Sequence, residues 1–253
     1  MPVHIHPTAP LARRALLPGD PGRALALAQL VLSEPKMFNH NRGLWGYTGT
    51  AIDGELMTIQ STGMGGPSAA IVLEELCDLG LTEAIRVGTC GALDAQLALG
   101  DLVIADAALA GDGASRALGA DGLVAADAGL VAALHAAAQS APLDGAAVHR
   151  GPIATSDLFY EHGPGRAAAW REAGALAIEM ETATLLRLGE LRGIRVACVL
   201  AVSDVLDAGG ERVRLDADEL LRAGERIGRV GAAALAAAAN RAADPAGPPA
   251  SGG

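Results

Sequence analysis

Segments with the pattern of short buried strands alternate with helix-patterned segments along nearly the whole chain. The apolar, strand-like segments are 15–17, 44–52, 56–61, 85–87, 101–105, 146–154, 176–178 and 194–202. The helix patterns cover 21–32, 67–79, 125–140, 166–172, 182–192 and 215–240. Because this alternation lays helices over a sheet, we predict one α/β domain over residues 1–240, with a central mixed β-sheet flanked by helices. Residues 241–253 are rich in Pro, Gly and Ala and are predicted to be a disordered tail.

Charge and composition exclude several classes of partner. The formal charge of −10 repels nucleic acid and anionic membranes, and 2% aromatic residues leave no stacking platform for single strands. Cys77, Cys90 and Cys198 are odd in number and widely spaced, which favours neither disulfides nor a zinc site. No segment has the pattern of a signal peptide or a transmembrane helix. We expect a cytoplasmic protein without a metal, and without nucleic-acid or membrane partners.

An arginine interrupts one of the apolar strand patterns. Arg86 lies between Ile85 and Val87, and the stretch Gly88–Gly91 that follows predicts a tight turn. A buried guanidinium needs a partner, because removing its water costs more than packing its stem returns. That partner is either a protein carboxylate or a bound anion such as phosphate, for which Thr89 and the following amides would be further donors.

A second candidate anion site lies where the first strand pattern meets a helix. Asp20 is a good N-cap and Pro21 fits the first helical turn, so free amides, Gly19 and Arg23 come together at the helix N-terminus. The alternative is an ordinary corner with a solvated arginine. Arg42 lies in a polar loop and is likewise either solvated or directed towards a ligand.

Carboxylates and one aromatic residue follow later strand patterns. Glu179 and Glu181 suit the vicinal hydroxyls of a sugar, or they complement the charge at the start of the next helix. Asp204 follows the most strand-like segment, 194–202, and is suited to general acid catalysis. Phe159 is either a planar wall for a flat ligand or a core aromatic under a loop.

These segments, taken in order, resemble a known family. They are 17–23, 41–43, 63–68, 86–92, 156–160, 179–181 and 202–204. Together they resemble the bacterial purine nucleoside phosphorylases of the nucleoside phosphorylase-I family, over nearly the whole chain before the tail. The resemblance implies the family fold and phosphorolysis of purine (deoxy)ribonucleosides to the free base and (deoxy)ribose 1-phosphate.

The resemblance also implies a role for each matching residue. The phosphate would be held by Gly19, Arg23, Arg86 and Thr89, with Arg42 from a neighbouring subunit, and Arg86 would also be catalytic. The ribose would be held by Met180, Glu181 and a neighbour's His4. The base would be held by Cys90, Gly91, Phe159, Ile178, Ser203 and Asp204, and Asp204 would protonate purine N7.

Shared sites of this kind imply a homo-oligomer, typically a hexamer built as a trimer of dimers. Inorganic phosphate would be the co-substrate, with no cofactor or metal. Two assignments stay open: His6 is the alternative to His4, and either Arg212 or Arg214 could assist Asp204.

Three rival functions remain. Uridine phosphorylases resemble the chain at 65–68 and 112–115, but residues 161–166 lack the glutamine of that branch, and Ser203-Asp204 is typical of the purine branch. Related nucleosidases lack the phosphate arginines, so Arg23 and Arg86 argue against hydrolysis. A non-catalytic nucleoside-binding relative would be expected to lose Asp204 or one of these arginines.

Overall fold

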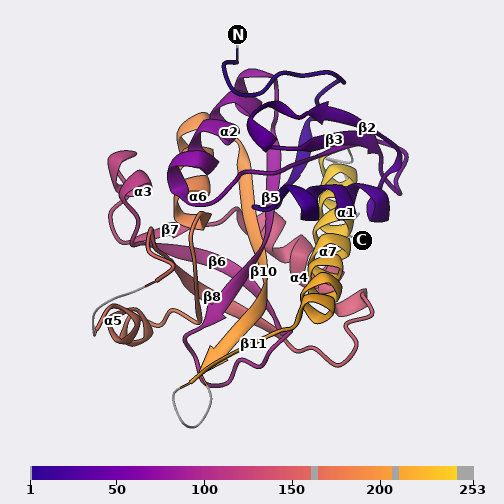
Figure 1. The fold of residues 1–253 in the computed structure, drawn as a ribbon. Helices are drawn as coiled ribbons and strands as arrows, with labels where there is room; N and C mark the ends of the chain where they lie inside the picture. The colour runs from indigo at the N-terminus through magenta and orange to yellow at the C-terminus, as the bar shows by residue number, and fades with distance from the viewer. Residues whose placement is uncertain (1, 161–164, 207–210, 244–253) are drawn as a thin grey trace, which may run out of the picture.

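A mixed β-sheet forms the centre of the protein and helices cover it (Figure 1). The structure is a computed structural model that describes residues 2–160, 165–206 and 211–243. Its strands are β1 (Arg14–Leu17), β2 (Ser33–Asn39), β3 (Gly46–Thr50), β4 (Leu56–Gln60), β5 (Glu83–Ala92), β6 (Leu102–Ala110), β7 (Leu123–Ala125), β8 (Val148–Thr155), β9 (Ala177–Glu179), β10 (Arg195–Leu206) and β11 (Arg212–Arg214). The helices are α1 (Pro21–Val31), α2 (Gly66–Asp78), α3 (Gly113–Ala117), α4 (Ala128–Ser140), α5 (Arg166–Glu172), α6 (Thr182–Arg192) and α7 (Ala217–Ala243), with a 3₁₀ turn η1 (Asn41–Gly43).

Five strands of the sheet close on themselves. Strand β10 pairs with both β5 and β6, β8 pairs with β6, and β9 joins β8 to β5. The remaining strands extend from this ring. Beyond β5 the order is β1, β4, β3 and β2, while β11 pairs with β10 and β7 pairs with β6. The C-terminal ends of β5 and β10 and the short strand β9 therefore meet at one place.

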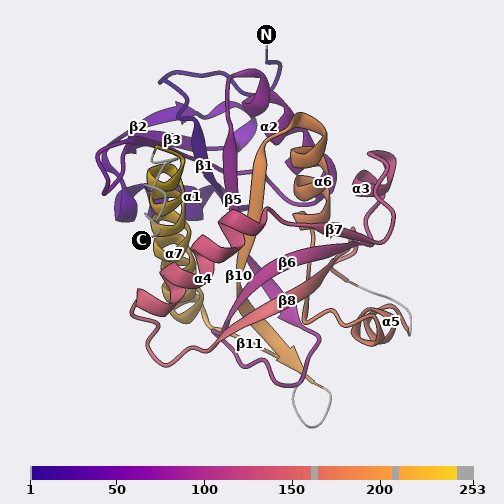
Figure 2. The same ribbon diagram turned by 180° about the vertical axis from the view of Figure 1, so that it is seen from behind.

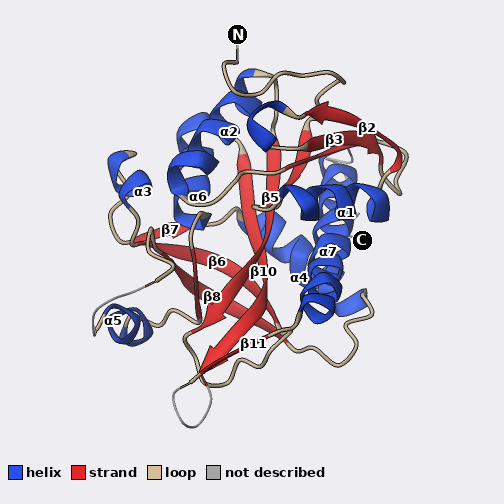
Figure 3. Cartoon of the chain, in the orientation of Figure 1, coloured by secondary structure: helices blue, strands red, loops and turns tan. Residues whose placement is uncertain are grey.

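Helices pack on both faces of the sheet because successive side chains of each strand point to opposite faces. On one face, α1, α4 and α7 cover apolar residues such as Leu16, Ile85 and Val87 (Figure 2). On the other, α2 and α6 cover residues such as Leu17 and Cys90 (Figure 3). Arg86 alternates with Ile85 and Val87 and so projects towards the α2 and α6 face.

The predicted tight turn at Gly88–Gly91 is wrong, because β5 continues through these glycines to Ala92. Strand pairing keeps the segment extended: β10 pairs with it as far as Gly91, and Gly91 also pairs with Ile178 of β9. The glycines serve close approach instead. A Cβ at Gly88 would lie 2.8 Å from the guanidinium carbon of Arg86, and one at Gly91 would lie 2.9 Å from Oδ1 of Asp204.

The remaining differences from the sequence predictions concern short elements and ends. Strands β2, β7 and β11 were not predicted, since each is short, exposed or contains proline. Strand β10 continues past Asp204 to Leu206, and α3 lies inside the predicted loop 111–122. Helix α7 extends to Ala243, beyond the predicted end at 240, and the rest of the predicted tail, 244–253, lies outside the described residues.

Candidate active site

One cavity of about 740 Å³ brings together most of the predicted site residues. It lies where the ends of β5 and β10 meet β9 and the start of α1. The predicted residues that line it are Gly19, Arg23, Arg86, Thr89, Cys90, Gly91, Phe159, Ile178, Met180, Glu181, Ser203 and Asp204. Residues from five separate stretches of sequence therefore form one candidate site.

Arg86 is paired with carboxylates and still has a free donor. Its Nε donates to Oε2 of Glu179 at 2.8 Å, and its Nη2 lies 2.5 Å from Oε2 of Glu181. Its Nη1 is buried and has no hydrogen-bond partner among the described residues. Burial lowers the pKa of Arg86, but Glu181 and Glu179 outweigh it, so the pKa is raised and the side chain stays charged. Both predicted kinds of partner are thus possible at once: two nitrogens meet carboxylates and the third can meet an anion.

Glu179 is a site residue that sequence reasoning left without a role of its own. Its carboxylate accepts hydrogen bonds from Thr155 Oγ1 at 2.6 Å, the Glu181 amide at 2.9 Å and the Thr182 amide at 3.0 Å, besides the Arg86 bond. The Thr182 amide belongs to the first turn of α6, so Glu179 takes the predicted part of a helix-terminal carboxylate. Glu179 therefore orients Arg86, and its acceptor positions are taken by protein donors rather than left for sugar hydroxyls.

Glu181 occupies a different electrostatic position. Its Oε1 accepts from the Gly65 amide at 2.5 Å, and only a small part of its surface is exposed. Burial raises the pKa of Glu181 and Glu179 raises it further, while Arg86 and Arg23 only partly offset these effects. Glu181 lines the cavity, where a ligand hydroxyl can reach it.

Arg23 lies in the first turn of α1 as predicted. Asp20 is the N-cap of this helix and its carboxylate accepts from the Arg23 amide at 2.7 Å. Burial lowers the pKa of Arg23, and the positive charge of Arg86 lowers it further. The carboxylates of Asp20 and Glu181 act in the opposite direction but do not cancel this shift. In the described part of the chain no carboxylate forms an ion pair with its guanidinium. Two mutually repelling guanidiniums with unused donors favour an anion between them.

Asp204 lies across the cavity on an irregular part of β10. The pairing with β5 shifts register between Val202 and Asp204, and the bulge brings Asp204 opposite Gly91. Ser203 Oγ lies 3.0 Å from Oδ2 of Asp204 and 3.1 Å from the Cys90 carbonyl oxygen. Asp204 is thus almost fully buried while its carboxyl group still lines the cavity.

The two arginines of β11 have separate contacts. Arg212 Nη1 donates to Oδ1 of Asp204, so of the two open candidates it is Arg212 that meets the acid. Arg214 lies over the ring of Phe159, 5.1 Å from its centroid. Residues 207–210, which connect β10 to β11, lie outside the described part of the chain.

Phe159 is half-exposed and lines the cavity, so the core-aromatic alternative is wrong. Its ring meets Tyr160 edge-on, with centroids 4.9 Å apart. Ile178 lines the same cavity and pairs with Gly91. A flat ligand in the cavity would therefore have an aromatic ring and an aliphatic side chain among its walls.

His4 and Arg42 do not line this cavity. Arg42 is exposed in η1 with a φ of 57°, and the side chain of its neighbour Asn41 donates to the His4 carbonyl oxygen at 2.9 Å. His4 Nδ1 lies 2.8 Å from Oε1 of Glu75 on α2. His6, the alternative, is exposed and its Nε2 lies 3.2 Å from the Val3 carbonyl oxygen. The two predicted neighbour-donated residues thus lie close together on one surface.

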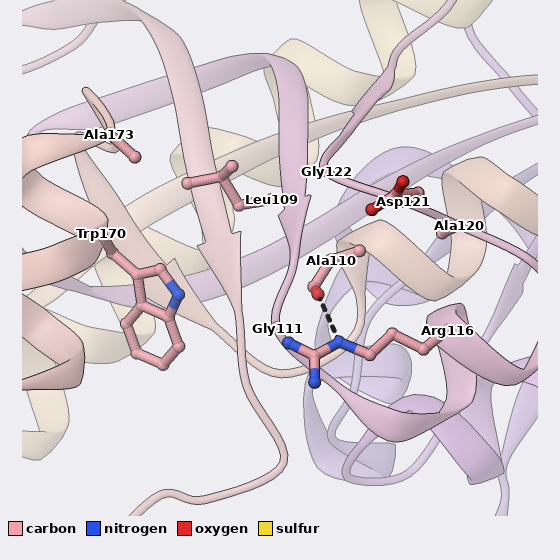
Figure 4. A pocket seen from close by; sticks show the side chains of 9 residues that line it. All are labelled: Leu109, Ala110, Gly111, Arg116, Ala120, Asp121, Gly122, Trp170 and Ala173. Carbon is pink, nitrogen blue, oxygen red and sulfur yellow. Dashed lines mark hydrogen bonds between the residues drawn. The ribbon is translucent and has the colours of Figure 1, made fainter.

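A second cavity of about 530 Å³ lies beside α5 (Figure 4). Trp170 projects into it, and Arg116 Nε donates to the Ala110 carbonyl oxygen at 3.0 Å. None of its nine lining residues is a predicted site residue. Helix α5 separates the two cavities, because Ala167 and Arg171 of the same helix line the first one.

The described residues contain no group of three or more His, Cys, Asp or Glu side chains arranged to hold a metal ion. None of their helices combines the length and the apolar character needed to cross a membrane.

Comparison with known proteins decides the family. Residues 13–238 match the sequence profile of the phosphorylase superfamily. The chain belongs to this superfamily. Its α/β domain with a central mixed sheet flanked by helices is the predicted fold.

Named relatives of this superfamily member cover most of its length. It is 39% identical over 215 residues to the "Purine nucleoside phosphorylase DeoD-type" of Geobacillus kaustophilus, covering 83% of this chain and 89% of that one. A protein of the same name from Clostridium perfringens is 38% identical, covering 78% and 83%. The "Guanosine phosphorylase" of Halorubrum lacusprofundi is 36% identical, covering 81% and 84%. The predicted family resemblance is confirmed.

Proposed function

We propose that the protein catalyses the phosphorolysis of purine nucleosides, releasing the free base and ribose or deoxyribose 1-phosphate. The observation that carries the proposal is the convergence of unused donors from Arg23 and Arg86 in one cavity, with the carboxyl group of Asp204 also lining it. The names of relatives at 36–39% identity support the same activity.

In this proposal the phosphate meets Arg23, the free Nη1 of Arg86, Thr89 and the backbone at Gly19. A phosphate oxygen attacks C1′ of the sugar while the bond from C1′ to the base nitrogen breaks. Positive charge develops on the sugar, and the phosphate held by the arginines stabilises it. The carboxylates on Arg86 fix the guanidinium beforehand, so no reorganisation is needed during the reaction.

Glu181 and Met180 hold the ribose. An ionised Glu181 accepts hydrogen bonds from the 2′ and 3′ hydroxyls. Its orientation is fixed from two sides, by the Gly65 amide on Oε1 and by Arg86 on Oε2. The sugar is therefore held at a set position relative to the phosphate.

Asp204 protonates purine N7 as the base leaves. The electron pair of the broken bond passes to the base, and the proton from the Asp204 carboxyl group neutralises it. Arg212 then stabilises the carboxylate that remains, and Ser203 helps to orient it. Phe159, Ile178, Cys90 and Gly91 form the walls around the base.

A neighbouring subunit completes the site. His4 and Arg42 are near each other but outside their own cavity, which supports donation to a second copy. The Glu75 carboxylate holds Nδ1 of His4 as a donor, and Nε2, which has no partner among the described residues, can meet a 5′ hydroxyl. We infer a homo-oligomer, a hexamer built as a trimer of dimers, that works in the cytoplasm with phosphate as its co-substrate and no cofactor.

The uridine alternative loses part of its support. The segment 112–115, which resembles uridine phosphorylases, caps α3: Asp112 accepts from the Ser115 amide at 2.8 Å and from Thr184 Oγ1 at 2.6 Å. Asp112 and Ser115 are buried, and no residue of the segment lines the cavity. Of the segment 161–166 that lacks the glutamine, residues 161–164 lie outside the described part of the chain.

One assay tests the proposal. The purified protein is incubated with inosine, adenosine, guanosine, methylthioadenosine and uridine, with and without phosphate. We expect release of purine bases that depends absolutely on phosphate. Base release in phosphate-free buffer would show hydrolysis instead, and turnover of uridine alone would favour the uridine branch.

The Asp204→Asn variant tests the general acid. We expect it to lower adenosine turnover by about 10²–10⁴-fold, the usual contribution of a positioned acid. Thermal unfolding and the KM for phosphate serve as controls for folding and for the phosphate site. Near-normal adenosine turnover in this variant would remove Asp204 from the mechanism.

A further inference from the structure

We propose that Arg171 selects 6-oxopurines, such as hypoxanthine and guanine, over 6-aminopurines at this site. The inference rests on the proposed function, because it names the base that the same cavity prefers. Arg171 has no role in the family resemblance, and it lies on α5 rather than on a strand end.

Arg171 lines the main cavity and is held in place at one nitrogen. Its Nε donates to the Leu93 carbonyl oxygen at 2.8 Å. Its two Nη atoms have no hydrogen-bond or ion-pair partner in the described part of the chain. The guanidinium is therefore anchored while several donors remain available to a ligand.

The anchor lies next to the base end of the cavity. Leu93 comes two residues after Gly91, which faces Asp204 and pairs with Ile178. An extended chain covers about 7 Å in two residues. Asp204 beside Gly91 and Arg171 anchored at Leu93 therefore line neighbouring parts of the same cavity wall.

The packing of α5 fixes the direction of Arg171. Its neighbour Trp170 packs against Gly111, where an added Cβ would lie 3.1 Å from the Trp170 ring (Figure 4). Successive helical residues are rotated by about 100°, so with Trp170 in the second cavity Arg171 is turned towards the first. The second cavity thus accommodates the side chain that orients Arg171.

The other cavity arginines at this end are already engaged. Arg212 donates to Asp204, and Arg214 lies over the ring of Phe159. Among the described residues, Arg171 is the one of these three arginines whose guanidinium contacts neither the acid nor an aromatic ring. Positive charge here also favours a base that leaves with negative charge.

The chemistry of the purine edge then gives the preference. A 6-oxopurine presents two acceptors side by side, N7 and O6, whereas a 6-aminopurine presents the acceptor N7 and an amino donor. Arginine has donors and no acceptor. With Asp204 at N7, the free Nη groups of Arg171 match O6 and oppose an amino group.

The test compares kcat/KM for inosine and adenosine in the wild type, Arg171→Met and Arg214→Met. We expect the wild type to prefer inosine, and Arg171→Met to reduce the inosine-to-adenosine ratio on the order of ten- to a hundredfold. Arg214→Met is the matched control: it removes a cavity arginine that contacts an aromatic face, and stacking does not distinguish the two bases, so the ratio should persist. An unchanged ratio in Arg171→Met, or a wild type without preference, overturns the inference.

Two further measurements keep the test independent of folding and of the proposed function. Calorimetry on the wild type should show hypoxanthine binding more tightly than adenine, and the reverse order overturns the inference. Arg171→Lys keeps a charged donor and should restore part of the lost ratio; a ratio as low as that of Arg171→Met contradicts the hydrogen-bonding role. Failure of every purine nucleoside to react with phosphate would instead overturn the proposed function itself.

Discussion

Two buried arginines on neighbouring strands, Arg14 on β1 and Arg86 on β5, differ in one respect. In the pairing of these strands Arg86 faces Leu17 and Arg14 faces Glu83, so they lie at opposite ends of it. Both side chains are almost fully buried. Their difference lies in how completely the protein satisfies them.

Arg14 has a protein partner at every nitrogen. Nη1 and Nη2 each donate to Asp53 at 2.6 Å, Nη2 also reaches the Glu55 carbonyl oxygen at 3.2 Å, and Nε donates to the Leu56 carbonyl oxygen at 3.1 Å. Asp53 lies in the turn between β3 and β4, so the pair ties this hairpin to β1. Arg86 meets two carboxylates and yet keeps Nη1 unpaired.

The comparison teaches how to distinguish a structural arginine from one that binds a ligand. Arg86 interrupts an apolar strand and Arg14 begins one, and both have carboxylate partners. A buried donor without a partner is costly, and a fold tolerates it where a ligand later supplies the acceptor. The remaining predictions test this distinction.

The largest effect is expected from Arg86→Met. Its loss leaves Glu179 and Glu181 without their cation, which should lower the free energy of unfolding by about 3–5 kcal/mol. It also removes the proposed phosphate donor, so kcat/KM for phosphate should fall by about 10²–10³-fold in the protein that remains folded. Denaturant unfolding and steady-state kinetics measure the two losses. A stability loss with normal phosphate kinetics would make Arg86 a structural residue like Arg14.

The same substitution at Arg14 should affect stability alone. Arg14→Met leaves Asp53 partly buried without its cation, and we expect a loss of about 3–5 kcal/mol in the free energy of unfolding. The specific activity per folded molecule should stay at the wild-type value, because Arg14 does not line the cavity. Kinetics at a temperature where both proteins are folded make this comparison. A raised KM for phosphate in Arg14→Met would contradict the purely structural role of Arg14.

The smallest effect is a difference between two pH values on the acid side: the pH at which activity is lost and the lower pH at which the protein unfolds. The hydrogen bond from Arg14 lowers the pKa of Asp53, so its stabilisation is complete above the unfolded-state pKa and is lost as pH falls through the lower folded-state pKa. Burial raises the pKa of Glu181, so Glu181 becomes protonated at a higher pH and then loses the ionised carboxylate that the proposed contact with the ribose hydroxyls requires. Its protonation removes an unfavourable buried charge, so it does not itself unfold the protein.

The expected result is therefore a fall in kcat/KM for nucleoside at a pH where the fold is still intact. Parallel pH profiles of activity and of circular dichroism measure the separation. Coincident loss of both signals would show that unfolding, rather than Glu181, sets the acid limit.

The larger elements of the fold were predictable because their patterns are local. Helices α5 and α6 begin and end where the sequence predicts, and α1 begins at Pro21 behind the cap Asp20. The extension of β5 through Gly88–Gly91 was not predictable, because its strand pairing involves β9 and β10, far away in the sequence. Glycine composition alone indicates a turn, and only the partner strands keep it extended.

The site was predictable in its members more than in its contacts. The sequence and the family resemblance indicated Arg23, Arg86, Glu181 and Asp204, and the structure brings all four to one cavity. The roles of those residues in catalysis stay predictions. Two contacts were not predictable: Glu179 holds Arg86, and Arg212 rather than Arg214 meets Asp204. Both depend on distances between segments, which no spacing along the chain encodes.

The sequence by itself determined the alternating strands and helices, the helix caps and the family, since each depends on neighbouring residues or on motifs in a fixed order. Only the tertiary structure decided which donors of Arg86 are satisfied and which one stays free. That decision depends on where the carboxylates of β9 and of the start of α6 lie relative to β5. Strand pairing sets these positions, although Arg86 and Glu179 are 93 residues apart in the sequence.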